Sequence, residues 1–358
     1  MTRKGAIYGT PNYIYNKPGY NLPKYLPFDK LGKTTIYDPS EDGKSIVETN
    51  VTCYNFYVNS ISSTSIEGEI ETGSGTQEDP WINLNTVINS SYINCLCNSL
   101  CFQYVKIIIT GTINYHIGHY DYYDYFDFNK RLILDFDDVI IEQFDFYYYG
   151  TLFNDIVGIR FHNLEYKASY TEEIISHEIT IFSGCDRSIF YNIVGEIKVD
   201  EPYGSMYSAY GESYYYFWNI EDCTSILNCN ININISSGMH SVMTSIIIEH
   251  NYDDPSIIVI GSTFYTKSVK TNGYWFYTWY ARAYGIYSFY GSTSKNNIIL
   301  SNTKITCDAF CASPSTSQSL YLGYVACPLG FDAVVYNCDL SDSIMDSGPN
   351  NNNWTCYN

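Results

Sequence analysis

The sequence predicts an all-β fold, a right-handed parallel β-helix (solenoid) that has an N-terminal capping helix and an extended N-terminal arm. Three observations support this prediction. Short runs of β-forming residues recur along most of the 358-residue chain. An Asn or Gly recurs at one register of these runs, and apolar and polar residues alternate after it. Helical periodicity is confined to one short segment.

The recurring corner is clearest in two segments. IFYNIVGEIKV places Asn192 after an apolar pair, and ILNCNININIS places Asn228 at the same point. Asn, Asp and Gly accept a left-handed backbone at the lowest cost, so a sharp bend between two strands favours them. Their separations, roughly 24 to 41 residues, suit solenoid coils with loop insertions. The expected structural ladder is Asn163, Asn192, Asn228, Gly261, Asn302 and Asn337, with Gly111 and Asp135 as weaker members.

Residues 1–65 are expected to form an extended, Pro- and Tyr-rich arm rather than a helix or a packed sheet. The prolines of this segment are Pro11, Pro18, Pro23, Pro27 and Pro39. Such arms dock on a partner, so we expect this one to mediate assembly, either with a second protein or within a homo-oligomer.

Residues 66–100 are expected to cap the open end of the solenoid. Asp79 is placed as the N-cap and Pro80 at the first helical position. Trp81, Leu84, Val87 and Ile88 then fall on one helical face. A solenoid must cover its exposed core, which is the role we expect for this helix.

Residues 101–345 form the predicted β-helix with Tyr-rich loop insertions, and residues 346–358 form a predicted polar C-terminal tail.

The amino-acid composition limits the classes of molecule that the protein could bind. The formal charge is −19, so the surface repels phosphate backbones and excludes nucleic acid as a partner. Aromatic residues make up 17% of the chain because it holds 39 Tyr. A Tyr side chain buries a ring and keeps a hydroxyl in water, which suits contact surfaces. Neutral glycans, cations or proteins fit this surface better than polyanions.

No signal peptide is visible, because the stretch from Gly5 to Tyr20 carries Pro, Asn and Lys where an apolar segment should lie. No run of 18 apolar residues offers a membrane span. We expect an extracellular or virion-surface location. The protein would reach this location in one of three ways: by export that uses no such signal, by means of a leader that this sequence lacks, or by release when the cell lyses.

The twelve Cys permit two interpretations. Cys95, Cys97 and Cys101, or Cys307 and Cys311, are close enough in sequence for disulfides. The favoured interpretation is that cysteines beside the corners are buried free thiols, because they occupy positions where a small inward residue belongs. These are Cys185, Cys223, Cys229 and Cys338.

Tyr-rich insertions are the best functional candidates. Loops that leave a solenoid at repeated corners gather on one flank, where aromatic rings can contact a sugar face or another subunit. Local packing against the solenoid wall is the third alternative. The candidate ligand or interface residues are Tyr214, Tyr216, Trp218, Tyr274, Trp275, Tyr277, Trp279 and Tyr280.

Carboxylates give only weak catalytic candidates. Glycoside hydrolysis needs two converging acids, one of them with a raised pKa. Carboxylates that are neighbours in sequence point to opposite faces of a strand, so a catalytic pair would have to come from adjacent coils. The alternative is that these carboxylates simply lie in solvated acidic turns. The candidates are Asp135, Asp137, Asp253 and Asp254. His116 and His119 have a spacing that suits a metal only on a helix, so we predict no metal site and no cofactor.

The Asn corners at one register, with a helix before them, resemble the right-handed parallel β-helix (pectate-lyase-like) group. That group includes sugar-degrading enzymes and phage tailspikes, and the resemblance here is to the tailspike or surface-fibre type. It covers about residues 73–345 and is one of pattern, without a catalytic motif. The resemblance implies stacked Asn side chains at one tight corner and an N-terminal capping helix.

The expected function is structural or adhesive: a subunit of a viral tail spike or fibre, or of an extracellular filament. The aromatic loops would contact subunits or a surface glycan. The alternative is a carbohydrate-active β-helix enzyme that uses Asp pairs on adjacent coils. The fold serves both classes. The sequence does not specify the source, the oligomeric state, or whether a glycan is bound or cleaved.

Overall fold

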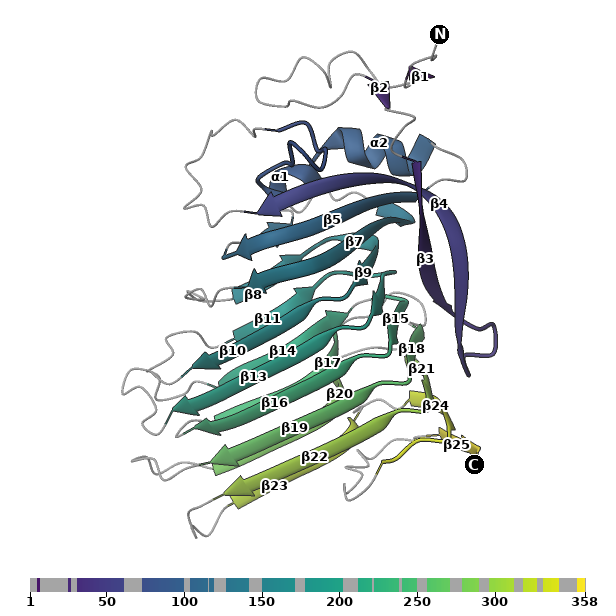
Figure 1. Ribbon diagram of the computed structural model, residues 1–358. Coiled ribbons are helices and arrows are strands. Elements are labelled where there is room, and N and C mark those ends of the chain that lie inside the picture. Colours follow the sequence, from purple (N-terminus) through teal and green to yellow (C-terminus); the bar gives the residue numbers. More distant parts are fainter. Residues whose placement is uncertain are drawn as a thin grey trace.

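The computed structural model has an all-β fold dominated by parallel strands in stacked sheets (Figure 1). It describes residues 5–6, 25–26, 31–60, 73–99, 104–114, 116–118, 127–141, 150–170, 178–201, 212–220, 222–237, 240–249, 256–270, 279–289, 296–311, 318–326, 331–340 and 353–357.

The largest sheet has eleven strands. In spatial order they are β25 (Asn353–Tyr357), β24 (Phe331–Tyr336), β21 (Asn296–Ser301), β18 (Ser256–Ile260), β15 (Thr224–Leu227), β12 (Ile189–Tyr191), β9 (Val157–His162), β7 (Asp127–Ile141), β5 (Tyr104–Ile113), β4 (Ile46–Ser60) and β3 (Leu31–Pro39). Its strands pair in parallel except for β3 and β4, which form an antiparallel hairpin.

Two further parallel sheets complete the stack. The seven-stranded sheet has the order β23 (Gln318–Ala326), β20 (Trp279–Phe289), β17 (His240–Glu249), β14 (Glu212–Ile220), β11 (Glu178–Ser183), β8 (Gly150–Asn154) and β6 (Ile117–Gly118). The five-stranded sheet has the order β10 (Glu165–Tyr170), β13 (Val194–Glu201), β16 (Asn230–Ser237), β19 (Thr263–Lys270) and β22 (Lys304–Cys311). Separately, β1 (Gly5–Ala6) and β2 (Tyr25–Leu26) form a short antiparallel pair.

From β9 to β24 the chain visits the eleven-, five- and seven-stranded sheets in that repeating order. We call each such passage a coil. This solenoid-like path places equivalent positions of successive coils next to each other, and the pairing of β13 with β16 and of β16 with β19 is in register along each strand. Inward-facing residues therefore stack on inward-facing residues, and outward-facing residues on outward-facing ones.

The interior follows from strand alternation. In β16, Ile231, Ile233 and Ile235 are fully buried, while the intervening asparagines face outward. One hydrophobic cluster runs from Tyr54 near the N-terminal end to Val335 in the last coils. Aromatic rings stack inside it from coil to coil, as the Phe161–Phe190 pair does with 4.9 Å between ring centroids.

The predicted cap is helical, but it begins later than predicted. Helices α1 (Leu84–Ile88) and α2 (Ser91–Ser99) lie at the N-terminal end of the stack (Figure 1). The N-cap is Asn83, whose side chain accepts a hydrogen bond from the Thr86 amide at 3.0 Å. The Asp79 N-cap prediction was wrong because Asp79 belongs to a turn with Thr76. Trp81 then pairs with Val58 in a strand-like bridge, which keeps it out of the helix.

Two terminal assignments also need correction. Residues 31–60 of the predicted arm form the β3–β4 hairpin, and β4 pairs in parallel with β5. Pro39 is tolerated because it ends β3, a strand at the edge of the sheet. Residues 353–357 of the predicted polar tail form β25, which pairs with β24. Apart from the β1–β2 pair, the other residues of the predicted arm lie outside the described ranges.

Neither helix of the described residues has the length and apolar character that crossing a bilayer requires.

Candidate functional site at the corners and the hairpin interface

The predicted ladder residues occupy one corner, between the eleven-stranded and five-stranded sheets. All six have positive φ: Asn163 63°, Asn192 56°, Asn228 52°, Gly261 65°, Asn302 48° and Asn337 46°. Their amides donate to carbonyls of the next coil, for example Asn192 to Leu227 at 3.1 Å and Asn228 to Ile260 at 2.8 Å. The left-handed backbone thus turns the chain and keeps each corner bonded to the next.

Side-chain amides continue this bonding along the stack. Asn192 Nδ2 donates to Asn163 Oδ1 at 2.8 Å, and Asn337 Nδ2 donates to Asn302 Oδ1 at 2.9 Å. Gly261 has no side chain and interrupts the column, with nothing within 4 Å of where its Cβ would lie. The amides are committed to neighbouring coils, so they hold the stack together.

The weaker ladder members differ. Gly111 has a positive φ of 89°, as a corner requires. Asp135 does not have positive φ, but its Oδ1 accepts from Asn163 Nδ2 at 2.7 Å. Its Oδ2 lies 2.5 Å from Lys106 Nζ. This carboxylate therefore ends the amide ladder in an ion pair, an arrangement that serves packing rather than acid catalysis. Of the other catalytic candidates, Asp137 is exposed on β7, and Asp253 and Asp254 lie outside the described residues.

A column of hydroxyl and thiol groups lies one residue after the last four corners; its cysteines were predicted from the sequence, and Ser262 and Thr303 were not. Its members are Cys229, Ser262, Thr303 and Cys338, each donating to the carbonyl two residues earlier. Ser262 Oγ also accepts from the Cys229 amide at 3.0 Å. The same position holds buried Leu164 and Ile193 after the first two corners, so the polar column belongs to the last four corners.

The thiols are free in seven described cysteines: Cys53, Cys97, Cys185, Cys223, Cys229, Cys307 and Cys338. Burial raises the pKa of Cys229 to about 12, so it stays protonated and unreactive at neutral pH. Cys185 is likewise buried. Cys223, which was expected to be buried, is exposed at the start of β15.

The aromatic candidate residues fall into those that are buried, those that lie in strands and those outside the described ranges. Tyr216 and Trp218 were expected in a contact loop, but they lie in β14 and are buried, with Trp218 stacked on Phe182 at 6.2 Å between centroids. Their assignment as ligand residues was wrong because strand pairing turns them inward. Tyr214 is in the same strand, and Trp279 and Tyr280 begin β20. Tyr274, Trp275 and Tyr277 lie outside the described ranges.

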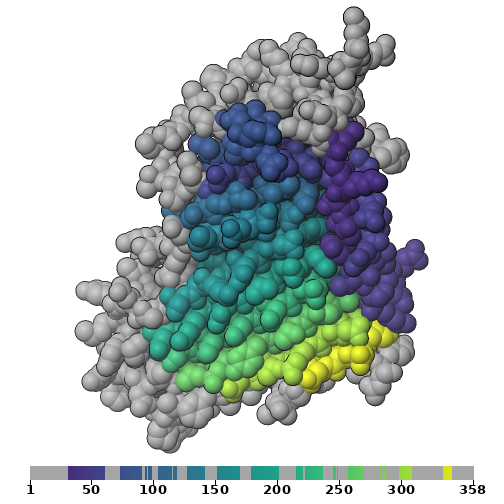
Figure 2. Space-filling view, in the orientation of Figure 1, coloured from purple at the N-terminus to yellow at the C-terminus, as the bar shows by residue number. Residues whose placement is uncertain are grey.

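The β3–β4 hairpin folds across the outside of the eleven-stranded sheet, and it is anchored by a buried arginine. Arg160 on β9 is 4% exposed. Its guanidinium lies 2.9 Å from Asp38 Oδ1 and donates to the Tyr37 carbonyl at 3.0 Å, while Nε donates to the Lys130 carbonyl at 2.8 Å. Figure 2 shows the hairpin running down one flank of the stack. This guanidinium therefore ties the hairpin, through Tyr37 and Asp38, to β9, and its Nε ties β9 to β7.

Beside this anchor, three rings meet. Tyr37 of the hairpin stacks on Tyr191 of β12, and the ring of His162 meets each edge-on at 5.6 and 5.7 Å between centroids. His162 is 4% exposed, and its Nε2 has no hydrogen-bond partner among the described residues. Burial lowers the pKa of His162 to about 4, so the imidazole is neutral at physiological pH.

Tyr37 and Tyr191 also belong to a second apolar cluster, outside the main core. Its buried members are Ile189, Leu227 and Ile260, one from each of three successive coils. Burial, followed by a hydrogen bond with Tyr37, raises the pKa of Tyr191 to about 12. The hairpin thus covers an apolar stripe that would otherwise face water.

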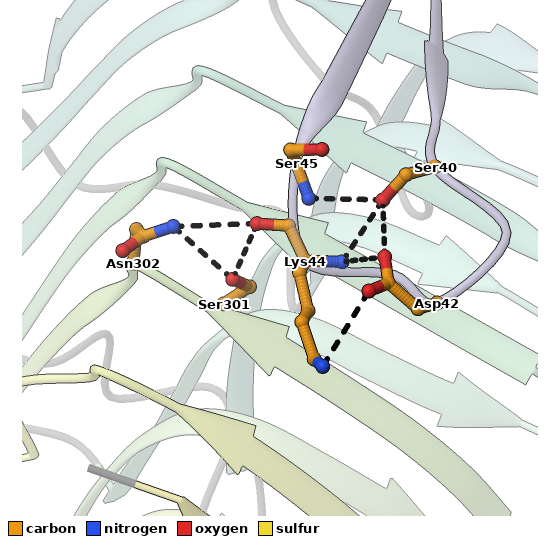
Figure 3. Close-up of polar contacts among 6 residues, drawn as sticks. All are labelled: Ser40, Asp42, Lys44, Ser45, Ser301 and Asn302. Atoms are coloured by element: carbon orange, nitrogen blue, oxygen red, sulfur yellow. Dashed lines mark hydrogen bonds and ion pairs between the residues drawn. The ribbon is translucent and has the colours of Figure 1, made fainter.

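The tip of the hairpin reaches a much later coil (Figure 3). Ser301 Oγ donates to the Lys44 carbonyl at 2.8 Å, and Lys44 Nζ lies 4.8 Å from the centre of the Tyr336 ring. Ser40 and Asp42 shape the turn by accepting from the Lys44 amide at 3.1 and 3.2 Å. The hairpin therefore bridges coils from β9 to β24.

Acidic groups line the corner between the seven- and eleven-stranded sheets. Arg187 contacts both Asp127, at 3.0 Å, and Asp222, at 3.7 Å. Nearby in the chain, burial raises the pKa of Asp155, and Asn154 Nδ2 donates to Asp155 Oδ2 at 2.8 Å. Within the described residues, no three His, Cys, Asp or Glu side chains gather as metal ligands.

Comparisons with family models, with curated proteins and with solved structures each return no match to this chain.

Proposed function

We propose that the protein is structural or adhesive, built on a right-handed parallel β-helix of the tailspike or surface-fibre type. It would serve as a subunit of a viral tail spike or fibre, or of an extracellular filament. One observation carries this proposal: polar side chains of the described coils bond along the stack. The ladder amides, the Asp135–Lys106 pair and the buried hydroxyls of Ser262 and Thr303 all join one coil to the next, the hydroxyls through the Cys229 amide and the Val259 carbonyl.

A rod made this way resists unwinding, because each coil is held to its neighbours at the corners as well as along the strands. The hairpin adds a contact from the first strands to the coil of Ser301 and Tyr336. In the sequence, the Tyr-rich segment 271–278 connects β19 to β20. Its aromatic residues would supply contacts to another subunit or to a neutral glycan.

Assembly and binding test this proposal together. Light scattering after size exclusion, with electron microscopy, should show oligomers or filaments at micromolar protein. A glycan array should show whether a neutral sugar binds. Replacing residues 271–278 with a Gly/Ser linker of equal length should weaken either contact. The matched control replaces 312–317, in the equivalent connection one coil later. A stable monomer that binds no glycan would overturn the proposal.

A carbohydrate-active enzyme is the competing proposal, and Asp155 favours it. Glycosidases need one acid with a raised pKa, and burial raises the pKa of Asp155 at a corner of the stack. Reducing ends released from a polysaccharide panel would measure this activity. The enzyme proposal requires Asp155→Asn to abolish the release and Glu41→Gln, at an exposed position of the hairpin, to leave it unchanged. Absence of release from every polysaccharide would eliminate it.

The proposed location is extracellular or on a virion surface, as the structural role requires. Fractionation of the native source, followed by immunodetection on intact particles or cells, measures this directly. Detection only in the interior of cells would contradict it.

A further inference from the structure

Two tyrosines from distant parts of the chain lie face to face at the hairpin interface. Tyr37 and Tyr191 have ring centroids 3.5 Å apart and planes inclined by 3°. This separation is close to the van der Waals contact distance of two carbon atoms, so the rings overlap almost completely. Isolated aromatic pairs prefer an offset or edge-on arrangement. The surroundings of the pair therefore impose its alignment.

Those surroundings can be identified. His162 meets both rings edge-on from the buried side. The Arg160 guanidinium fixes the backbone of Tyr37 through its carbonyl, and it fixes the next residue through the Asp38 carboxylate. Tyr191 is held in β12 by pairing on both sides. Both rings are thus attached to rigid elements.

The two phenol groups also point the same way. A hydrogen bond between the Tyr37 and Tyr191 side chains contributes to the raised pKa of Tyr191. Because the hydroxyls adjoin and the rings overlap, the ortho carbons of one ring lie over those of the other. Both side chains are part-exposed, so the pair is accessible from solvent.

We propose that Tyr37 and Tyr191 form a site of oxidative modification, at which a dityrosine cross-link joins the hairpin covalently to the coil stack. A heme peroxidase using hydrogen peroxide removes one hydrogen atom from each phenol and releases two waters. The two phenoxyl radicals couple through one ortho carbon each, forming a C–C bond. The two ring hydrogens then move to the oxygens and restore both phenols.

The full-length protein, treated with a heme peroxidase and hydrogen peroxide, tests the site. Dityrosine fluorescence should appear in the monomer band of a denaturing gel. Peptide mapping should find residues 37 and 191 in one cross-linked pair that is two hydrogen atoms lighter than its separate peptides. The cross-linked chain should also melt at a higher temperature, because the link closes a long loop in the unfolded chain.

Tyr37→Phe and Tyr191→Phe keep the ring and should each abolish this peptide pair. Tyr265→Phe, on the outer face of β19, is the matched control and should leave its yield unchanged. Circular dichroism confirms that the variants remain folded. Coupling of other tyrosines in wild-type protein without the 37–191 pair would overturn the proposal, as would persistence of that peptide mass in either Phe variant.

Discussion

At the residue scale, one side chain at the corner of each coil must meet two requirements. It must tolerate a left-handed backbone, and it must place an amide where the next coil can bond it. Asn meets both needs at Asn192, with φ of 56° and a 2.8 Å bond to Asn163. Gly261 meets only the first, and its corner lacks the amide contact.

The first prediction separates these two contributions at Asn192. Asn192→Ala should lower the free energy of unfolding by about 1–2 kcal/mol, through left-handed strain and the lost hydrogen bond. Asn192→Gly should lower it less, since glycine relieves the strain. Urea unfolding followed by circular dichroism measures both. Equal losses in the two variants would show that backbone strain is not the main term.

Gly261→Asn provides the reciprocal variant. Nothing lies within 4 Å of its Cβ position, so the new side chain has room. The amide column would become continuous from Asn228 to Asn302, and the unfolded chain would lose the entropy of a glycine. Left-handed strain of Asn at φ of 65° offsets part of this, so we expect the free energy of unfolding to rise by no more than about 0.5 kcal/mol. Destabilisation would mean that the column cannot close at this coil.

The second prediction concerns the buried imidazole of His162. Its pKa is about 4 in the folded protein and 6.5 when unperturbed, so the unfolded chain binds the extra proton between these values. Stability therefore falls as pH drops from 6.5 towards 4. The groups facing His162 are Asp135, Arg160 and Lys106, besides the two tyrosine rings.

His162→Phe keeps an aromatic ring and removes the titration. From pH 7 to pH 5, wild type should lose about 2 kcal/mol more of unfolding free energy than the variant. Urea unfolding at both pH values measures the difference. The comparison is between variants at equal pH, because the many carboxylates of the chain also titrate. An identical pH dependence in the two proteins would contradict the prediction.

At the element scale, the β3–β4 hairpin is the part that differs most from a plain stack of coils. It shares a sheet through β4 and β5, yet its other contacts reach Arg160, Tyr191 and Ser301 in coils far along the chain. Tyr37 and Ile46 pack on the outer apolar stripe, while Asp38 pairs with one buried guanidinium. Loss of that pairing should loosen the hairpin without unfolding the coils.

The third prediction tests this anchor with Asp38→Asn. The substitution leaves the Arg160 guanidinium buried without its counter-ion, although two carbonyls still accept from it. Because the Asp38 side chain is 36% exposed, we expect a loss of about 1–2 kcal/mol, below that of a fully buried pair. Hydrogen exchange should accelerate in residues 31–47 and not in β16.

Glu41→Gln is the control for this experiment. It removes the same charge from an exposed position at the tip of the same hairpin, and no measurable change is expected. Faster exchange in both variants would attribute the effect to net charge, and the anchor would lose its assigned role.

At the scale of the whole molecule, one apolar cluster connects the helices to the last coils. Each coil touches mainly its two neighbours, so an end coil has less support than a central one. The hairpin reduces this difference in support between end and central coils, because it joins its own strands to the coil of Ser301. Free thiols distributed along the stack offer a direct measure of where it opens first.

The fourth prediction uses these thiols as reporters of opening. Iodoacetamide should label Cys223 in the native protein, because that side chain is exposed, and spare buried Cys229. With rising urea, Cys307 in β22, near the C-terminal end, should react before Cys229 in the centre. Mass spectrometry of the digested protein reads each site. Labelling of native Cys229 as fast as Cys223 would contradict the buried packing of the column.

The parts of the fold that the sequence predicted are those encoded locally. A positive φ selects Asn or Gly at a single position, and strand alternation has a period of two, so the corners and inward isoleucines could be read directly. The helix start was misplaced because Asp79 and Pro80 carry the same local signal in a turn. Tyr216 and Trp218 were misplaced because a Tyr-rich run of sequence is compatible with either a loop or a strand.

The sequence by itself determined where the coils bend and which strand faces turn inward, because both depend on neighbouring residues. Only the tertiary structure decided that Asp38 meets Arg160 and that Tyr37 stacks on Tyr191. More than a hundred residues separate each pair, and no local propensity specifies a partner at that distance. Such contacts exist because successive coils together form an apolar stripe that the hairpin covers.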